Sequence, residues 1–248
     1  GKPAKSPSRK EWKLVWKDDF KGKKLNLKNW TRYTRDGKSD WDRHMSGLDS
    51  LCRVENGVLQ LWGINTPEGY KDEDNRPFLT GGVGSKGKRS VKNGRFEVRA
   101  RYDCGEGFWP AIWLMPDIRI RHPFGGQVDI MEHLNNDNVV FQTVHTPHTL
   151  YKREPTIQHY VTVPIKKDEF NVYAVELSDS EVTFYVNGEK KNKKKNQEPE
   201  LEGQFPFYHY PFYVILSAQL GGSWVGNVGP QDLPVKMEID YVRVYERR

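Results

Sequence analysis

The 248-residue sequence lacks the features that mark several specialised classes of protein. Its longest uninterrupted apolar runs span only a few residues, which excludes a transmembrane helix. Only two cysteines occur, Cys52 and Cys104, so a disulfide scaffold is excluded. They could form one bridge, but we expect two free or merely packed thiols, because unpaired cysteines are commonly buried. No signal peptide is present, and we expect any export signal to have been removed before residue 1.

Motifs for metals and nucleotides are also missing. The sequence has no Cys/His cluster with zinc spacing, no EF-hand loop and no phosphate-binding glycine loop, so we expect no catalytic cofactor. The net charge is only +6, and much of the excess lies in residues 1–10 and 190–195. The second run follows an Asn-Gly turn, as a solvated hairpin end would. Heparin or nucleic-acid binding is therefore a minor alternative, and we expect no nucleic-acid partner.

Aromatic side chains are what the sequence has in excess. It contains 8 Trp, 12 Tyr and 11 Phe, which is more flat apolar surface than a core alone requires. A content of 36% hydrophobic and 29% charged residues argues against a disordered or fibrous chain. Residues 1–10 are rich in Lys, Pro and Ser and predict a flexible leader, which would suit a tether behind a lipid anchor or a frayed terminus. Residues 11–248 contain no linker or repeat and predict a single domain.

The dominant hydrophobic period is two residues, which is the period of β-strands. Residues 95–102 are apolar at even positions and charged at odd ones, so we expect one face on a core and the other in water. Residues 53–61 and 182–188 each contain Asn-Gly, the strongest short hairpin signal, and residues 237–245 alternate as a closing strand. Only residues 168–173 could hold a helical turn. The pattern predicts an all-β fold of two stacked sheets.

The segment 125–133 carries the groups with the most evident chemistry. Gln127 and Asp129 share one face of a strand, but Glu132 would point to the other face. One bulged residue restores the phase, and β-bulges are frequent beside active sites. The remaining spacing of about 13 Å between Cα atoms still lets long side chains lean toward the ~5–5.5 Å that separates the carboxyls of a retaining glycosidase. A polar strand facing solvent is the alternative.

The sequence of residues 127–132 resembles the Glu-x-Asp-x-x-Glu signature of glycoside hydrolase family 16. That family includes laminarinases, mixed-linkage glucanases, agarases, porphyranases, carrageenases and endo-β-galactosidases. The resemblance implies a jelly-roll sandwich of two antiparallel sheets, with an open cleft on the concave sheet. The likeness extends along nearly the whole chain and is carried by residues 12–20, 80–83, 107–115, 221–224 and 240–245.

The resemblance implies a catalytic role for each polar residue of the motif. Glu132 would be the general acid and base, and Asp129 would hydrogen bond to the nucleophile and hold the pKa values apart. Position 127 would be the nucleophile, but the amide of Gln127 cannot form a glycosyl-enzyme intermediate. The rest of the motif is intact, which favours a substitution made to trap a bound sugar over a natural loss of activity.

Four tryptophans are candidates for stacking on sugar rings or for filling the core. Trp109 and Trp224, beside a proline and a Gly-Gly pair, are expected to present their faces to sugars. Trp113 is expected to fill the core or to pack beneath the site. Trp41 lies in a charged loop that resembles the loop shaping the non-reducing-end subsites, and we expect it to be a stacking platform. A merely solvated loop is the alternative.

Polar sugar contacts are expected from four further residues, Arg43, Arg76, His145 and Gln219. His145 is expected to face the cleft and to hydrogen bond to the carboxyl of Glu132 or to the leaving-group sugar. The resemblance also implies a possible structural calcium ion held by Asp240, although that residue could equally lie on the surface of an edge strand.

These expectations describe a secreted, periplasmic or surface-tethered retaining endo-β-glycosidase, acting as a monomer on an oligosaccharide or polysaccharide and inactivated by Gln127. An endo-β-1,3(4)-glucanase acting on laminarin or mixed-linkage glucan is a close alternative, and a non-catalytic lectin with a native Gln127 is a further one. The substrate we favour contains β-1,4-galactosidic bonds, as in poly-N-acetyllactosamine or algal galactans. That preference depends on the net positive charge and on cationic residues expected near the cleft: Arg43, Arg76, Arg119, Arg121, His122 and Arg153.

Overall fold

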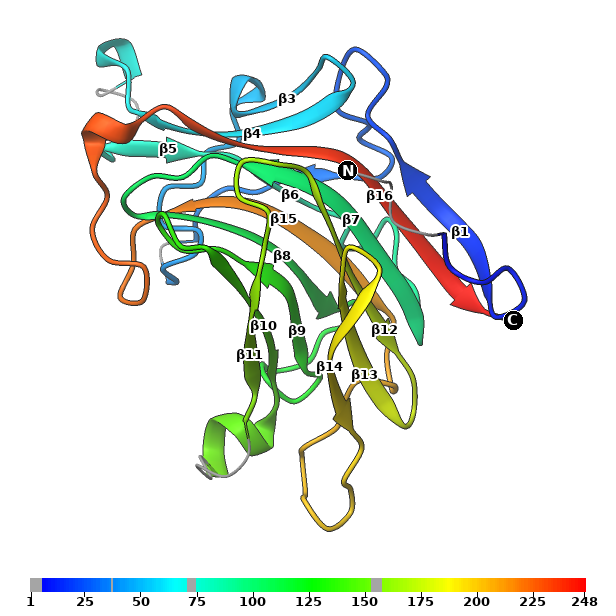
Figure 1. Ribbon diagram of the computed structural model, residues 1–248. Coiled ribbons are helices and arrows are strands. Elements are labelled where there is room, and N and C mark those ends of the chain that lie inside the picture. Colours follow the sequence, from blue (N-terminus) through cyan, green and yellow to red (C-terminus); the bar gives the residue numbers. More distant parts are fainter. Residues whose placement is uncertain (1–5, 37, 71–74, 153–157) are drawn as a thin grey trace.

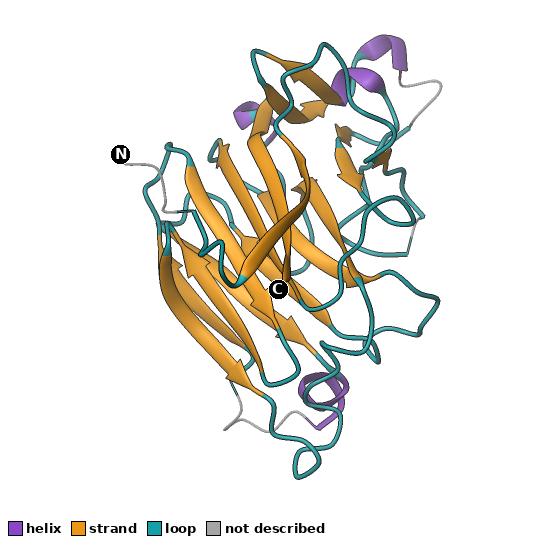
Figure 2. Ribbon diagram, turned by 90° about the vertical axis from the view of Figure 1, so that its right-hand side faces the viewer, coloured by secondary structure: helices purple, strands orange, loops and turns teal. Residues whose placement is uncertain are grey.

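The computed structural model of the protein describes residues 6–36, 38–70, 75–152 and 158–248, which fold into two stacked antiparallel β-sheets (Figures 1 and 2). The first sheet contains β1 (Trp12–Asp18), β3 (Cys52–Glu55), β4 (Val58–Asn65), β5 (Phe78–Thr80), β7 (Gly94–Tyr102), β12 (Asn171–Leu177), β13 (Glu181–Val186), β14 (Glu189–Lys195) and β16 (Val235–Arg247). The second contains β2 (Thr31–Arg32), β6 (Gly82–Gly84), β8 (Phe108–Pro116), β9 (Gln127–Glu132), β10 (Val139–His145), β11 (Tyr160–Pro164) and β15 (Phe212–Leu220).

The strand order brings distant parts of the chain together. The first sheet follows the path β14-β13-β12-β7-β16-β4-β3, with β1 beside β16 and β5 beside β4, and the second the path β11-β10-β9-β8-β15-β6-β2. Figure 1 shows the first strand, in blue, lying along the last, in red. Short helical turns lie at η1 (Asp49–Leu51), η2 (Glu68–Tyr70), η3 (His148–Lys152) and η4 (Pro230–Asp232). The predicted all-β sandwich is confirmed.

The core lies between the sheets, and β15 in the second sheet is covered on both faces. On β15, Phe212, Val214 and Leu216 belong to the inter-sheet core. Tyr213 and Ile215, which alternate with them, form a separate buried cluster on the opposite face. All nine residues of β15 are buried, which explains why residues 212–216 form an apolar run instead of alternating with polar residues.

Both predicted Asn-Gly hairpins are present. Asn56 (φ 55°) and Gly57 (φ 75°) join β3 to β4, and Asn187 (φ 50°) and Gly188 (φ 80°) join β13 to β14. Positive φ at both central residues is the type I′ geometry that matches the twist of the strands. The lysine-rich run is the edge strand β14, paired along its length with β13.

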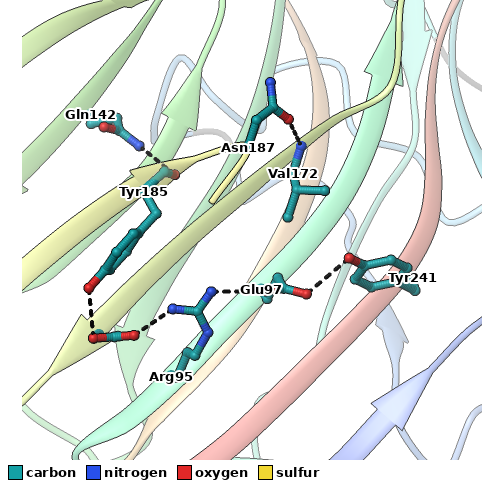
Figure 3. Close-up of polar contacts among 8 residues, drawn as sticks. Arg95, Glu97, Gln142, Val172, Tyr185, Asn187 and Tyr241 are labelled. Carbon is teal, nitrogen blue, oxygen red and sulfur yellow. Dashed lines mark hydrogen bonds and ion pairs between the residues drawn. The ribbon is translucent and has the colours of Figure 1, made fainter. Parts of the chain in front are cut away.

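The charged face predicted for residues 95–102 is not fully in water. Arg95 is only 5% exposed and Glu97 only 3%. Figure 3 shows why: the guanidinium of Arg95 donates to Glu97, and the hydroxyl of Tyr241 donates to the other oxygen of the same carboxylate. Arg95 also pairs with Glu176 on β12. Because β12 and β16 flank β7, their long side chains cover its outer face and pair with its charges.

Two further expectations concern local structure. Residues 168–173 form no helical turn, because Asn171 already pairs with Ala100 at the start of β12. Cys52 and Cys104 are free thiols, as predicted, and burial raises the pKa of Cys52 to about 12. Residues 1–5 of the predicted leader lie outside the described residues. Within the described part of the chain, no helix has the length and hydrophobicity needed to cross a membrane.

Candidate active site

A cleft of about 770 Å³ lies over the second sheet, on the face turned away from the core. Its walls are mostly aromatic, with Trp41, Trp109, Trp113 and Trp224 among the lining residues. The polar side chains that line it include the three motif residues on β9. An apolar cleft with a few convergent polar groups is the usual form of a small-molecule or glycan site.

A β-bulge brings the motif residues to one side of β9. The pairing of β9 with β8 shifts register between Asp129 and Met131, so Ile130 is the extra residue. Ile130 packs in the inter-sheet core, while Gln127, Asp129 and Glu132 line the cleft. The bulge predicted from the spacing of these residues is confirmed.

Asp129 lies at the centre of the site, between Gln127 and His145, and is only 2% exposed. Its Oδ1 accepts a hydrogen bond from Nε2 of Gln127 at 2.8 Å, and its Oδ2 lies 2.8 Å from Nε2 of His145. Burial opposes ionisation of Asp129, but the charge of His145 and the hydrogen bonds from His145 and Gln127 outweigh it and lower the pKa of the carboxyl. His145 was expected to contact Glu132 or a sugar. Its hydrogen bond goes to Asp129 and not to Glu132, because His145 opposes Gln127 in the β9–β10 register, and the contact with a sugar stays a prediction.

Glu132 has the properties of a general acid. Burial, followed by the negative charge of Asp129, raises the pKa of Glu132 well above its ordinary value, and a hydrogen bond from Trp109 opposes the shift only in part. That bond runs from Nε1 of Trp109 to Oε2 of Glu132 at 2.9 Å. A carboxyl that stays protonated toward neutral pH can donate its proton to a leaving oxygen.

The amide of Gln127 is held on both sides. Its Oε1 lies 2.8 Å from Nε2 of His122, while its Nε2 donates to Asp129. The oxygen can only accept, so His122 must carry a proton on Nε2. The side chain at position 127 is thus fixed in the cleft beside Asp129.

The family-model comparison agrees with this geometry. A model described as glycosyl hydrolases family 16 matches residues 45–243, which is most of the chain. The chain belongs to glycosyl hydrolase family 16.

Relatives of this family 16 chain have different substrates in their names. It is 32% identical to the keratan-sulfate endo-1,4-β-galactosidase of Sphingobacterium multivorum over 95% of this chain, but spans only 56% of that protein. It is 31% identical to the β-glucanase of Rhodothermus marinus, covering 94% of this chain and 85% of that protein.

Solved structures show the same division. The laminarinase from Rhodothermus marinus superposes with a TM-score of 0.85 at 30% identity, covering 96% of this chain and 98% of that one. A second structure comes from a study of the endo-acting O-glycanases that human gut microbiota express to initiate mucin breakdown. It superposes with a TM-score of 0.81 at 32% identity, covering 94% of this chain and 98% of that one. The predicted jelly-roll fold is therefore confirmed.

All four tryptophans line the cleft, as the sequence analysis allowed. Trp224 is 46% exposed and contacts Trp109 edge to face, with ring centroids 5.7 Å apart. Trp41 lines the cleft and packs edge to face on Trp113 at 5.0 Å and on Tyr33 at 5.2 Å. Trp113 does not fill the inter-sheet core. It packs beneath the cleft, which is the second of its two expected places, because its position on β8 has the same parity as Trp109.

Two predicted arginine contacts are not brought into the site. The guanidinium of Arg43 pairs with Asp40, and neither Arg43 nor Arg76 is among the described residues that line the cleft. Gln219, by contrast, does line it and is only 1% exposed.

The electrostatic reason for favouring an anionic or galactose-containing substrate is not supported by the cleft. Among the described residues, the wall holds two carboxylic acids and three histidines, and no arginine or lysine lines it. Of the six cationic residues expected near the cleft, His122 lines it, Arg153 lies outside the described residues, and four do not line it: Arg43, Arg76, Arg119 and Arg121.

The surroundings of Asp240 do not fit a calcium ion. Its Oδ2 accepts a hydrogen bond from Arg99 at 2.9 Å, and its Oδ1 lies 3.5 Å from Nζ of Lys21, which also donates to the carbonyl of Gly57. Calcium needs six to eight oxygen ligands, whereas two cations already neutralise this carboxylate. The described residues include no group of three or more His, Cys, Asp or Glu that could hold a metal.

Several cleft residues were missed by the sequence analysis as parts of the site. Phe141 and Thr143 could have been found, because they precede His145 by four and two residues on β10 and therefore share its face. His122 was noted only for its charge, although it contacts Gln127. No sequence motif around Tyr33 indicates a place in the site, because Tyr33 reaches the cleft only by packing on Trp41 in the folded chain.

The raised pKa of Glu132 makes the fold sensitive to pH. Glu132 binds its proton more tightly in the folded chain than at its ordinary pKa of 4.5, so its contribution to stability is full below about that pH and is lost as pH rises through the folded pKa. Glu132→Gln removes this loss. We expect equal melting temperatures for variant and parent near pH 4, and a higher melting temperature for the variant at pH 7 to 8. A difference that does not change with pH would contradict the shift.

Proposed function

We propose that this family 16 chain has the site of a retaining endo-β-glycosidase, halted because Gln127 occupies the nucleophile position. The observation that carries the proposal is the cluster on β9, where Asp129 bonds to Gln127 and its charge helps to raise the pKa of Glu132. Glu132 is thereby kept protonated for the role of the acid, and Asp129 holds the side chain at position 127, where the motif has its nucleophile. An open cleft along the sheet suits internal cleavage of a long chain.

The proposed reaction has two steps, and both use these side chains. With a carboxylate at position 127, that group attacks the anomeric carbon while Glu132 gives its proton to the departing glycosidic oxygen. Glu132 then takes a proton from water, and the water oxygen displaces the carboxylate at position 127. Trp109 holds Glu132 by its indole N–H, and the carboxylate at position 127 accepts hydrogen bonds from His122 and from a protonated Asp129. Two inversions at the same carbon give net retention.

For the substrate we propose a glycan with β-1,4-galactosidic bonds, of the poly-N-acetyllactosamine or algal galactan type. The support is the likeness to the Sphingobacterium multivorum galactosidase and to the mucin O-glycanase structure, each at 32% identity. A β-1,3(4)-glucan is the second candidate, supported by the better coverage of the Rhodothermus marinus β-glucanase. Chains of both kinds are found outside cells, and we propose a secreted, periplasmic or surface location for the protein, acting as a monomer.

A lectin function is the alternative that Gln127 itself favours. One relative, 26% identical, is named a β-1,3-glucan-binding protein of Penaeus monodon. Isothermal titration calorimetry of the chain as it stands, against oligosaccharides from laminarin, lichenan, agarose, porphyran, keratan sulfate and mucin, tests the ligand class. We expect binding without turnover, strongest for a galactose-containing chain. Binding only to laminarin or lichenan fragments would instead assign the glucan.

The aromatic walls give a second prediction. Trp224→Ala should weaken binding of the best oligosaccharide by about 1–3 kcal/mol and hardly change the melting temperature, because the ring is 46% exposed. Trp41→Ala should weaken binding by a similar amount and also lower the melting temperature by a few degrees, since Trp41 packs on Tyr33 and Trp113. Calorimetry and thermal melts measure both. Unchanged affinity in both variants would place the sugar elsewhere.

A further inference from the structure

Gln219 is a buried amide that faces the proposed glycan cleft with an unused donor. It lies on β15, is 1% exposed and lines the cleft. Its Nε2 has no hydrogen-bond partner among the described residues, although it is a buried polar atom. A buried N–H group left unpaired costs free energy, which an oxygen of a bound ligand in the cleft would recover.

The orientation of that amide follows from two neighbouring side chains. The indole Nε1 of Trp113, which can only donate, lies 3.1 Å from Oγ of Ser217. The hydroxyl of Ser217 is therefore an acceptor for Trp113 and has its own proton left to donate. The hydroxyl of Ser217 donates this proton to Oε1 of Gln219 at 2.6 Å. The carbonyl end of the amide is thereby bound toward Ser217, and the NH₂ end is left for the cleft.

We propose that Gln219 is a specificity-determining residue that donates to an oxygen of the bound sugar, and that Ser217 and Trp113 are positioning residues that fix its amide. The inference rests on the proposed glycan-binding function of this cleft. The free end of the amide is its NH₂ group, which can only donate. Its partner in the sugar is therefore an oxygen that accepts, and a hydroxyl oxygen is the first candidate.

The place of Gln219 in the sheet puts this contact close to the acid. Gln219 opposes Trp109 in the β15–β8 register, and Trp109 donates to Glu132. Ser217 opposes Ala111, which in turn opposes Glu132 on β9. Ser217 and Glu132 thus lie on either side of β8, and their backbones are two strand spacings, or about 10 Å, apart. The recognised sugar therefore lies in the part of the cleft next to the acid.

Three substitutions in the Gln127→Glu background test the proposal on the glycan that this background cleaves best. Gln219→Met keeps the length but removes the donor, and Gln219→Glu puts an acceptor in its place. Each should lower kcat/KM about 10- to 100-fold, the range for an unmade hydrogen bond to a buried group. Ser217→Ala frees the amide to rotate and should cause a smaller loss, of about 2- to 10-fold.

A matched control separates recognition from stability. Gln142 is also buried, but its Nε2 already donates to the carbonyls of Ile130 and Tyr185, the second of which is drawn in Figure 3. Gln142→Met should lower the melting temperature and leave kcat/KM within about twofold. Gln219→Met should do the opposite, with an unchanged or higher melting temperature, because it removes an unpaired buried N–H. A lowered melting temperature with unchanged kcat/KM in Gln219→Met would overturn the proposal.

Monodeoxy versions of the cleaved oligosaccharide identify the partner oxygen. In the protein with Gln219, one of these analogues should have a kcat/KM about 10- to 100-fold below that of the full oligosaccharide. In the Gln219→Met protein, the same analogue and the full oligosaccharide should have equal kcat/KM values. Equal losses in both proteins for every analogue would also overturn the inference.

The outcome is separable from that of the proposed function. If the Gln127→Glu protein cleaves nothing but oligosaccharide still binds, the same comparisons are made by calorimetry, and a loss of affinity in Gln219→Met supports the Gln219 contact while the enzyme function fails. If cleavage is restored and the Gln219 variants match their parent, the function stands and the inference fails. Absence of both binding and cleavage overturns both.

Discussion

Gln127→Glu is expected to convert a protein that only binds its glycan into one that cleaves it, with a gain of several orders of magnitude in rate. The amide at position 127 is held by His122 and Asp129. A carboxylate of the same length can still accept from His122, and it keeps a hydrogen bond with Asp129 when Asp129 carries a proton to donate. This carboxylate would supply the nucleophile that an amide cannot. Reducing-end assays on laminarin, lichenan, agarose, porphyran, keratan sulfate and mucin glycans measure the gain and name the substrate.

Controls at the same position show whether the gain depends on geometry. Gln127→Asp introduces a carboxylate that is one methylene too short, and it should recover much less activity than Gln127→Glu. Gln127→Ala should recover none. If Gln127→Glu gains no activity on any glycan while binding persists, the chain is a lectin and the proposed enzyme function is wrong.

Glu132→Gln in the Gln127→Glu background is expected to slow cleavage of the natural glycan by at least about 10²-fold, the scale of general acid catalysis. Glu132 is buried beside Asp129, which keeps its proton available for the leaving oxygen. Aryl glycosides with acidic leaving groups need less protonation and should lose much less. The ratio of kcat/KM for the two substrate types measures the role of the acid. An equal loss on both types would show that Glu132 does not protonate the leaving group.

The β-sandwich and the site cluster could be predicted because their signals are local. Alternation over residues 95–102, two Asn-Gly turns and the spacing of Asp129 and Glu132 each act within a few residues, and the bulge at Ile130 follows from that spacing. The same locality explains why both hairpins and the cleft side of β9 were obtained from the sequence.

What could not be predicted depends on strands that are distant in the chain. Arg95 is buried because it pairs with Glu176, 81 residues away, and Glu97 because Tyr241 covers it from 144 residues away. The bond from His145 to Asp129 depends on the register of β10 against β9.

Strands covered on both faces leave a second kind of question open. On β8, apolar side chains occupy both faces, so the sequence does not say which face meets the core. The sequence therefore left two places open for Trp113, in the core or beneath the site, and the structure shows the second. The position of Arg43 was missed for a different reason. Its guanidinium pairs with Asp40 in the same loop, and the sequence does not show which partner a loop arginine binds.

The configuration of the first product tests the central claim most directly, because it reports whether position 127 acts as a nucleophile. The Gln127→Glu protein is mixed with its best glycan, and proton NMR spectra are recorded before mutarotation equilibrates the new reducing ends. Attack by the side chain at position 127, followed by attack of water on the opposite face, predicts that the β-anomer appears first. Initial release of the α-anomer would mean a single displacement by water, and it would contradict the account.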